Sequence, residues 1–346
     1  MKKYAAGMAL GGVIALGVFI SLSAPIESAG MNPITIRLGT LAPSGSSFHT
    51  ALVEMGQKWR DASGGAVKLI IYPDGTQGGE AAMVRGLRAR SLSAGMFTVV
   101  GLSQIDRSVG GLSFMPLTFR SWDEYDYVAE RLSPRLEKVL LDRGFVVLFW
   151  GDAGFVRFFT KTPAVYPDDF KSLKLFTWTG NPEQVDIMRS LGYHPVPLET
   201  TDMLSGLQRD LFNAISLPPG QALLSQCYTI AKHMLALKWA VLSGGTVIRK
   251  DVWDNIPADV QQKLRAAAAE AGAKIRASDR KEDEESIVAM QKKGLVVHPA
   301  TPEVEEAWLK LTKTLYPQLR GKLVPEDIFD EVIRLVNEYR TRTTKK

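Results

Sequence analysis

Residues 151–219 read GDAGFVRFFTKTPAVYPDDFKSLKLFTWTGNPEQVDIMRSLGYHPVPLETTDMLSGLQRDLFNAISLPP. Short β-rich runs alternate here with helical patterns, which is typical of an α/β protein. Two of the predicted strands carry charge and ring side chains: Arg157 stands in the first, and Phe176 and Trp178 stand in the second. We expect these two strands to form one wall of a ligand cleft.

The flanking sequence predicts further α/β units. Before the central stretch, strands are expected at residues 34–41, 67–72, 96–102 and 146–150, and helices at residues 48–61 and 122–141. Ser46 or Ser47 would cap the first helix, and Ser121 and Glu124 would form a capping box on the second. After it, a helix is expected at residues 220–228 and strands at residues 239–241 and 246–250. Gly151 and residues 243–245 are the expected crossings between two domains.

Residues 257–293 form one long helical pattern that begins with a proline at a helix-first position. A helix of this length spans roughly 55 Å, which exceeds a single domain, so we expect it to lie along both. Two helices broken at Gly272 are the alternative. Two more helices are expected to start at residues 301–303 and 325–327.

Composition narrows the class of protein. The chain has 346 residues, of which 45% are hydrophobic and 23% charged, and these values suit two globular domains. Lys2, Lys3 and Glu27 give residues 1–30 a net charge of +1, so the remainder carries +4 of the total of +5. No basic stripe interleaved with aromatic residues is visible, and we therefore expect no binding to nucleic acid.

Residues 1–30 have the pattern of a signal peptide, with a charged start and an apolar run at residues 9–22. We expect export to the periplasm, with an uncleaved N-terminal anchor as the alternative. Cys227 is the single cysteine, which excludes an internal disulfide and a cysteine-based zinc site.

No catalytic motif is present. The four histidines, at positions 49, 194, 233 and 298, form no metal-ligand pair such as HExxH, and Ser205 lacks the GxSxG context of a hydrolase nucleophile. The glycines at positions 75, 78 and 79 fit neither phosphate-binding loop pattern. We expect neither enzyme activity nor a cofactor or metal.

The order and spacing of several segments resemble the periplasmic solute-binding receptors of tripartite ATP-independent (TRAP) transporters, of the dicarboxylate-receptor type. The segments are LGTLAPSGSSFHTAL, SGGAVKLIIYPDGTQGGE, SFMPLTFRSWDEY, GFVRFFTKTPAVYPDDFKSLKLF and LGYHPVPLETTDMLSGLQ, followed by the long helix. The resemblance implies an α/β fold of the two-lobed periplasmic-binding-protein (Venus-flytrap) type, with hinge-crossing strands and a long bridging helix. It also implies lobe I at residues 33–151 and 243–285, and lobe II at residues 152–242 and 286–346.

The chain departs from this family at its ligand site. The family usually places an arginine, which clamps the substrate carboxylate, in a strand reading K-I-R-V, and here Phe176 stands at that position. Leu198 and Leu217 replace further pocket positions, whereas Arg157 is kept. The predicted ligand-binding residues are Arg157, Phe176, Trp178, Phe48, Leu198, Leu217, Gln77 and Trp150.

The sequence therefore predicts a transport receptor that delivers a small organic ligand to the membrane permease subunits of a TRAP transporter. We expect an apolar ligand or a monocarboxylate rather than a dicarboxylate, and a monomeric protein. A lipid or hydrophobic-molecule carrier of an envelope complex is the alternative. The sequence does not name the ligand or the permease.

Overall fold

The computed structural model describes residues 32–344. The expected signal peptide and the last two residues of the basic tail lie outside the described residues.

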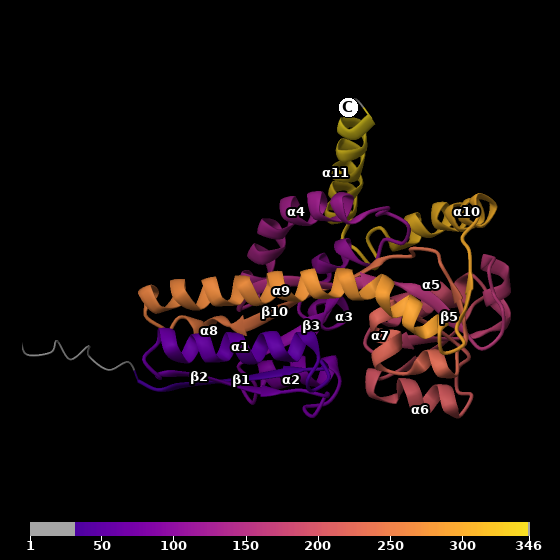
Figure 1. The fold of residues 1–346 in the computed structure, drawn as a ribbon. Helices are drawn as coiled ribbons and strands as arrows, with labels where there is room; N and C mark the ends of the chain where they lie inside the picture. The colour runs from indigo at the N-terminus through magenta and orange to yellow at the C-terminus, as the bar shows by residue number, and fades with distance from the viewer. Residues whose placement is uncertain (1–31, 345–346) are drawn as a thin grey trace, which may run out of the picture. The chain divides into compact units, whose positions relative to one another are not determined.

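Two mixed β-sheets organise the described chain (Figure 1). The first has the order β2-β1-β3-β10-β4, with strands Val67–Tyr72, Ile34–Thr40, Ala94–Thr98, Val241–Arg249 and Phe145–Phe155. The second has the order β11-β9-β5-β8-β6-β7, with strands Val296–His298, His233–Leu235, Arg157–Thr160, Ala214–Leu217, Lys174–Trp178 and His194–Leu198. Each sheet combines parallel strands with an antiparallel strand that has crossed from elsewhere in the chain.

Strands β4 and β10 make the two crossings. They pair antiparallel over almost their whole length, from Phe145 opposite Arg249 to Phe155 opposite Val241. Beyond Phe155 the chain enters β5 of the second sheet. Gly244 in β10 lies so close to β3 that an added Cβ would stand 2.4 Å from the carbonyl oxygen of Phe97. Only glycine fits at this point, so the crossing strands depend on it.

Helices pack on both sheets. The α-helices are α1 (Ser47–Ala62), α2 (Glu80–Arg88), α3 (Val99–Ser103), α4 (Trp122–Asp142), α5 (Pro182–Ser190), α6 (Met203–Gln208), α7 (Pro219–Leu224), α8 (Lys250–Trp253), α9 (Ala258–Gln291), α10 (Pro302–Leu319) and α11 (Glu326–Thr344). Short 3₁₀ helices are η1 (Arg107–Leu112), η2 (Pro167–Ser172), η3 (Thr200–Asp202) and η4 (Cys227–Thr229). The side chain of Ser46 accepts a hydrogen bond from the backbone N–H of His49, which confirms the predicted cap of α1.

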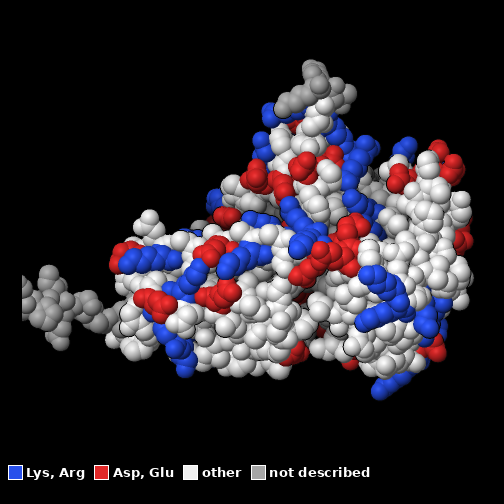
Figure 2. Space-filling model, viewed as in Figure 1, with Lys and Arg blue, Asp and Glu red and all other residues white. Residues whose placement is uncertain are grey.

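Helix α9 is continuous over 34 residues, which corresponds to about 50 Å. It contacts α1 and β4 along its first part and α7 farther on. Figure 1 shows α9, in orange, running above α1 and then above α7. Basic and acidic side chains are interspersed along α9 (Figure 2). One of them, Lys274, forms an ion pair with Glu54 on α1. The alternative of two helices broken at Gly272 is excluded.

Three local predictions were wrong in part. The third strand ends at Thr98 rather than at residue 102, because the Thr98 hydroxyl accepts from the N–H of Val100 and begins α3. The two strands expected around residues 243–245 are one strand, β10. The helix expected at residues 220–228 already ends at Leu224 and is followed by η4.

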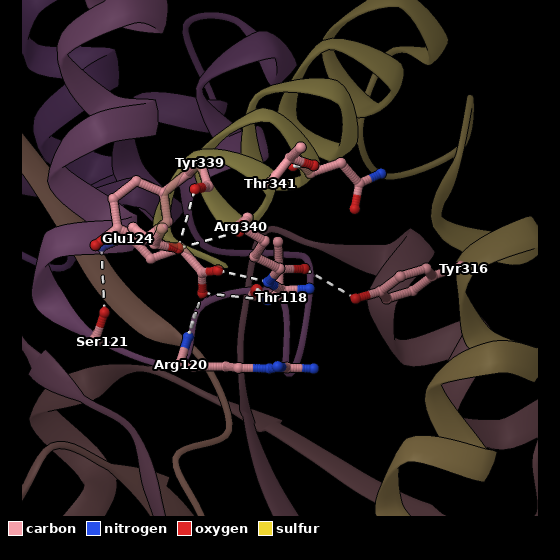
Figure 3. A network of polar contacts seen from close by, with 10 residues as sticks. Thr118, Arg120, Ser121, Glu124, Tyr316, Tyr339, Arg340 and Thr341 are labelled. Carbon is pink, nitrogen blue, oxygen red and sulfur yellow. Dashed lines mark hydrogen bonds and ion pairs between the residues drawn. The ribbon is translucent and has the colours of Figure 1, made fainter. Parts of the chain in front are cut away.

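The predicted capping box of α4 forms only in half. The hydroxyl of Ser121 accepts from the N–H of Glu124 at 3.3 Å. The carboxylate of Glu124 turns instead to the N–H of Arg120 and to the guanidinium of Arg340 on α11 (Figure 3). Glu124 is buried, so this bidentate pair fixes the end of α11 to the start of α4.

The predicted lobe boundaries stay a prediction. The contacts of α11 bear on them, because this helix packs against α4 and η1, which belong to the first predicted lobe. The second predicted lobe had included residues 326–344.

Candidate functional site

A cleft of about 350 Å³ lies between elements of the two sheets. One wall consists of residues at the carboxyl ends of β1 and β3, together with Phe48 at the start of α1. The opposite wall holds Trp178 and Leu217, at the ends of β6 and β8, and residues of η3 and α7. The crossing strands β4 and β10 and Ile275 of α9 complete the lining. Ligands of open α/β sheets bind at such strand ends.

Acidic groups line the cleft without basic partners facing into it. Asp74, Glu80 and Asp152 belong to the lining, whereas none of the described lining residues is a lysine, arginine or histidine. Glu80 is buried and accepts from the hydroxyl and N–H of Thr98 and from the N–H of Gly101 at 2.8 Å. Burial raises the pKa of Glu80. An anionic group in this cleft would therefore meet no opposing cation among the described lining residues.

Arg280 of α9 lies behind the cleft and is already engaged. Its guanidinium donates to Asp152 at 2.8 Å and to both carboxylate oxygens of Asp126, at 2.6 and 2.7 Å. It also stacks 4.2 Å from the ring centroid of Trp122. Burial is the main cause that raises the pKa of Asp152, and the hydrogen bond from Arg280 opposes it. This charge therefore balances two carboxylates rather than facing a ligand.

Two further carboxylates are buried on the same face of α9. Asp279 and Asp283 are 7% and 5% exposed, and the described chain offers no hydrogen-bond partner to Oδ2 of Asp279 or to Oδ1 of Asp283. Burial raises the pKa of Asp279 to about 8 and that of Asp283 to about 6. Arg157 of β5 lowers the pKa of Asp283, so the two groups attract each other in the interior.

A second cavity, of about 150 Å³, lies beside the cleft, and Trp178 lines both. Its walls come from β6 and β8, from helices α5 and α10, and from residues 113–116. We call it the ring cavity because its lining includes the aromatic residues Phe114, Phe158, Phe170, Phe176, Trp239 and Trp308. None of the described residues that line it carries a charge.

Comparison with known proteins identifies the family of this two-sheet chain. The family model of bacterial extracellular solute-binding protein family 7 matches residues 38–322. The chain belongs to this family. The predicted resemblance to TRAP receptors is thereby confirmed, and so is the absence of an enzymatic role, since the family consists of transport proteins.

Two named relatives of this family 7 chain are similar to it over most of its length and agree with this assignment. The C4-dicarboxylate-binding periplasmic protein DctP of Rhodobacter capsulatus is 23% identical over 330 residues, which cover 92% of this chain and 95% of that protein. The 2,3-diketo-L-gulonate-binding periplasmic protein YiaO of Escherichia coli is 24% identical and covers 82% of this chain and 87% of its own length.

Solved structures share the two-lobed fold. The sugar acid binding protein DctPAm of Advenella mimigardefordensis, in complex with galactonate, has a TM-score of 0.82 at 16% identity and covers 89% of this chain and 99% of its own. A TRAP periplasmic solute-binding protein of Haemophilus influenzae with bound L-gulonate has a TM-score of 0.80 at 22% identity and covers 88% and 99%. These likenesses confirm the predicted fold class.

The structure places the predicted ligand-binding residues of this family 7 protein in three settings. Phe48, Trp178 and Leu217 line the cleft. Phe176 belongs to the lining of the ring cavity, and its ring packs 5.3 Å from that of Trp178 and 5.2 Å from that of Phe212. Arg157, Leu198, Gln77 and Trp150 belong to the lining of neither cavity. Their roles in binding stay predictions.

Each of these four residues has a local environment outside the two cavities. Arg157 is 3% exposed and donates to the carbonyl of Phe155 at 3.1 Å. Trp150 donates from its indole to Glu137, and Gln77 is exposed. Leu198 packs against a core cluster that includes Leu207 of α6 and Phe212.

Sequence reasoning missed the polar residues of the cleft. Asp152 lies two residues beyond the strand predicted at residues 146–150, and Ser243 begins the predicted return crossing. Both could have been named from their place at the crossings. Thr200, Thr201 and Gln221 left no comparable signal, because they reach the cleft through η3 and α7.

The described residues contain no group of acidic, histidine and cysteine side chains that could hold a metal ion. Among the helices of residues 32–344, none combines the length and the apolar character needed to cross a membrane.

Proposed function

We propose that this TRAP-type receptor captures a ligand with substantial apolar area and at most one anionic group. The observation that carries the proposal is the absence of a basic residue from the described lining of the cleft, which also holds the apolar side chains of Trp178 and Leu217. Burying a carboxylate without a matching cation costs on the order of several kcal/mol, and a dicarboxylate incurs this cost twice. A ring or alkyl chain placed against Trp178 and Leu217 would instead gain about 25 cal/mol per Å² of buried apolar area.

The ligands of similar proteins bear on this proposal. The ligands bound in the two similar structures, galactonate and L-gulonate, are sugar acids with one carboxylate each. The R. capsulatus relative is named for C4-dicarboxylates. The single carboxylate agrees with the proposal, whereas the many hydroxyls of a sugar acid are the main competing chemistry.

Calorimetry with the exported protein tests the proposal. The panel contains C4-dicarboxylates, galactonate and L-gulonate, and aromatic and alkyl monocarboxylates. We expect saturable binding only among the aromatic and alkyl monocarboxylates. Submicromolar binding of a dicarboxylate by the unchanged chain, or a clear preference for the sugar acids, would contradict the proposal.

A charge variant sharpens the experiment. Thr201 lines the cleft and is exposed, so Thr201→Arg adds a cation there without disturbing the core. The variant is expected to gain dicarboxylate affinity of at least tenfold, which corresponds to about 1.4 kcal/mol. Thr343→Arg, at an exposed position of α11, serves as the matched control and should gain none.

Delivery to a TRAP permease and the alternative of a lipid carrier are separated by what the protein carries. Native mass spectrometry of the exported protein should find a small organic acid, whereas co-purified phospholipid would favour the carrier. A monomeric mass is expected in the same spectrum.

A further inference from the structure

The hydroxyl of Thr177 in the ring cavity is not explained by the fold. Thr177 lines this cavity and is 1% exposed, and its Oγ1 has no hydrogen-bond partner in the described chain. Buried polar groups in folded proteins are nearly always paired, and each exception calls for a cause. By contrast, the neighbouring hydroxyl of Ser113 is satisfied, because it pairs with Ser243 at 2.6 Å. The Thr177 hydroxyl is therefore free to bind a group that enters the cavity.

Hydrogen bonds fix the positions of residues in the walls of the ring cavity. The indole of Trp308 donates to the carbonyl of Val165 at 2.8 Å, while its ring stacks on Phe158 at 5.0 Å between centroids. The ring of Trp239 lies 5.2 Å from that of Trp308, and the carbonyl of Trp239 accepts from the N–H of Leu117 at 2.6 Å. Leu117 adopts a φ of 55°, which is unfavourable for a branched side chain and is tolerated where the surroundings impose it.

The segment that carries Phe114 is anchored from α10 and α11 (Figure 3). The hydroxyl of Tyr316 donates to the carbonyl of Pro116 and lies 2.9 Å from the hydroxyl of Thr118. Arg340 donates to the carbonyl of Thr118 while it pairs with Glu124. A wall fixed in this way does not collapse into the space beside it, so the cavity is preformed for a ligand.

We propose that the ring cavity is a second binding site, which takes one apolar ring of about six atoms carrying a single hydrogen-bonding group. A protein cavity of roughly 150 Å³ lined by leucine, isoleucine and phenylalanine binds benzene, and the ring cavity has about this volume. Its uncharged lining disfavours an ion, and the Thr177 hydroxyl supplies the one polar contact. The site is distinct from the cleft, so the inference does not depend on the ligand bound there.

Phenol and toluene are the probes, because they differ by a hydroxyl in place of a methyl group. Calorimetry on the full chain should show one saturable site for each, with phenol tighter. The variant Thr177→Val keeps the shape of the side chain and removes its hydroxyl. It is expected to weaken the binding of phenol about five- to tenfold and to leave the binding of toluene unchanged. An unchanged ratio of the two affinities would overturn the assignment of Thr177.

A cavity-filling pair of variants tests the location. Leu311 lines the ring cavity, whereas Leu309 on the same helix α10 is 41% exposed. Leu311→Trp should abolish binding of both probes, and Leu309→Trp should leave both unchanged. Equal binding of phenol by these two variants would refute the proposed site, as would the lack of saturable binding to the unchanged chain.

A cleft variant separates the two sites. Thr201→Trp narrows the cleft at a residue that does not line the ring cavity. It should weaken the binding of whichever organic acid calorimetry has shown to bind, and it should leave the binding of phenol intact. Loss of phenol binding in this variant would place the probe in the cleft and overturn the proposal. Phenol binding without any organic-acid binding would count against the proposed ligand of the cleft alone.

Discussion

Arg157 lies in β5 with its guanidinium buried beside Asp283, and its Nε has no hydrogen-bond partner in the described chain. Burying an arginine with a spare donor is costly. Arg157 lines neither cavity, so a ligand would relieve this cost only if closure of the cleft brought the two into contact. We predict that Arg157→Ala weakens ligand binding by more than about tenfold, or about 1.4 kcal/mol, while the fold survives. Calorimetry with circular dichroism measures both effects.

The control for this prediction is Arg189→Ala on α5, where the arginine side chain is 60% exposed. It should leave affinity unchanged. Unchanged affinity in Arg157→Ala would show that the guanidinium only balances Asp283.

Asp279 gives a pH dependence of stability. Its pKa rises from 3.8 in the unfolded chain to about 8 in the folded chain, because of burial and the neighbouring charges of Asp152, Glu282 and Asp283. Between these values the folded chain holds a proton that the unfolded chain has lost, so the free energy of unfolding falls as pH rises. Asp279→Asn should therefore be more stable than the unchanged chain at pH 8, by an amount on the order of a few kcal/mol.

Urea denaturation at several pH values tests this sign. The advantage of Asp279→Asn should disappear as the pH falls below 3.8, where this carboxyl is protonated in both states of the unchanged chain. Glu285→Gln, at a side chain 64% exposed on the same helix, should show no such trend. An advantage that is constant with pH would rule out titration as its cause.

At the scale of elements, α9 packs closely on β4 at Gly272. A Cβ added there would stand 2.8 Å from Cβ of Phe149, which is too close for either to remain in place. Helix propensity alone favours alanine over glycine by about 1 kcal/mol, whereas overpacking a core costs about 1–3 kcal/mol. We predict that Gly272→Ala is destabilising.

The exposed neighbour Ala273 provides the opposite control. Ala273→Gly has no packing effect and should cost about 1 kcal/mol through propensity alone. Thermal unfolding of both variants decides between the effects. A higher melting temperature for Gly272→Ala would mean that α9 and β4 are not packed as described.

At the scale of the whole molecule, ligand capture should bring the two sheets together. The connections between them include β4, β10 and α9, and we predict that α9 bends when the cleft closes. Small-angle X-ray scattering should then show a smaller radius of gyration with saturating ligand. A dicarboxylate that calorimetry shows not to bind is the control. An unchanged radius with bound ligand would contradict closure.

Local sequence signals determined much of this architecture by themselves. The Ser46 cap, the buried run before Gly151 and the unbroken helical pattern of residues 257–293 each act within a few residues, so they can be read along the chain. With the length of the chain, they predicted two domains, crossing strands and a long helix along both, whereas the two-lobed fold was implied by the family resemblance. The same local logic failed at Thr98, where a side-chain cap ended a strand that the pattern would have extended.

Tertiary structure decided the setting of each side chain at the site. The two-residue period of β6 places Phe176 and Trp178 on the same face of the strand. Trp178 nevertheless lines both cavities, whereas Phe176 lines the ring cavity but not the cleft. Arg157 meets Asp283, a partner more than a hundred residues away in the chain. Burial and charge at these positions arise only when distant segments pack together. The ligand chemistry therefore depends on contacts that no local pattern encodes.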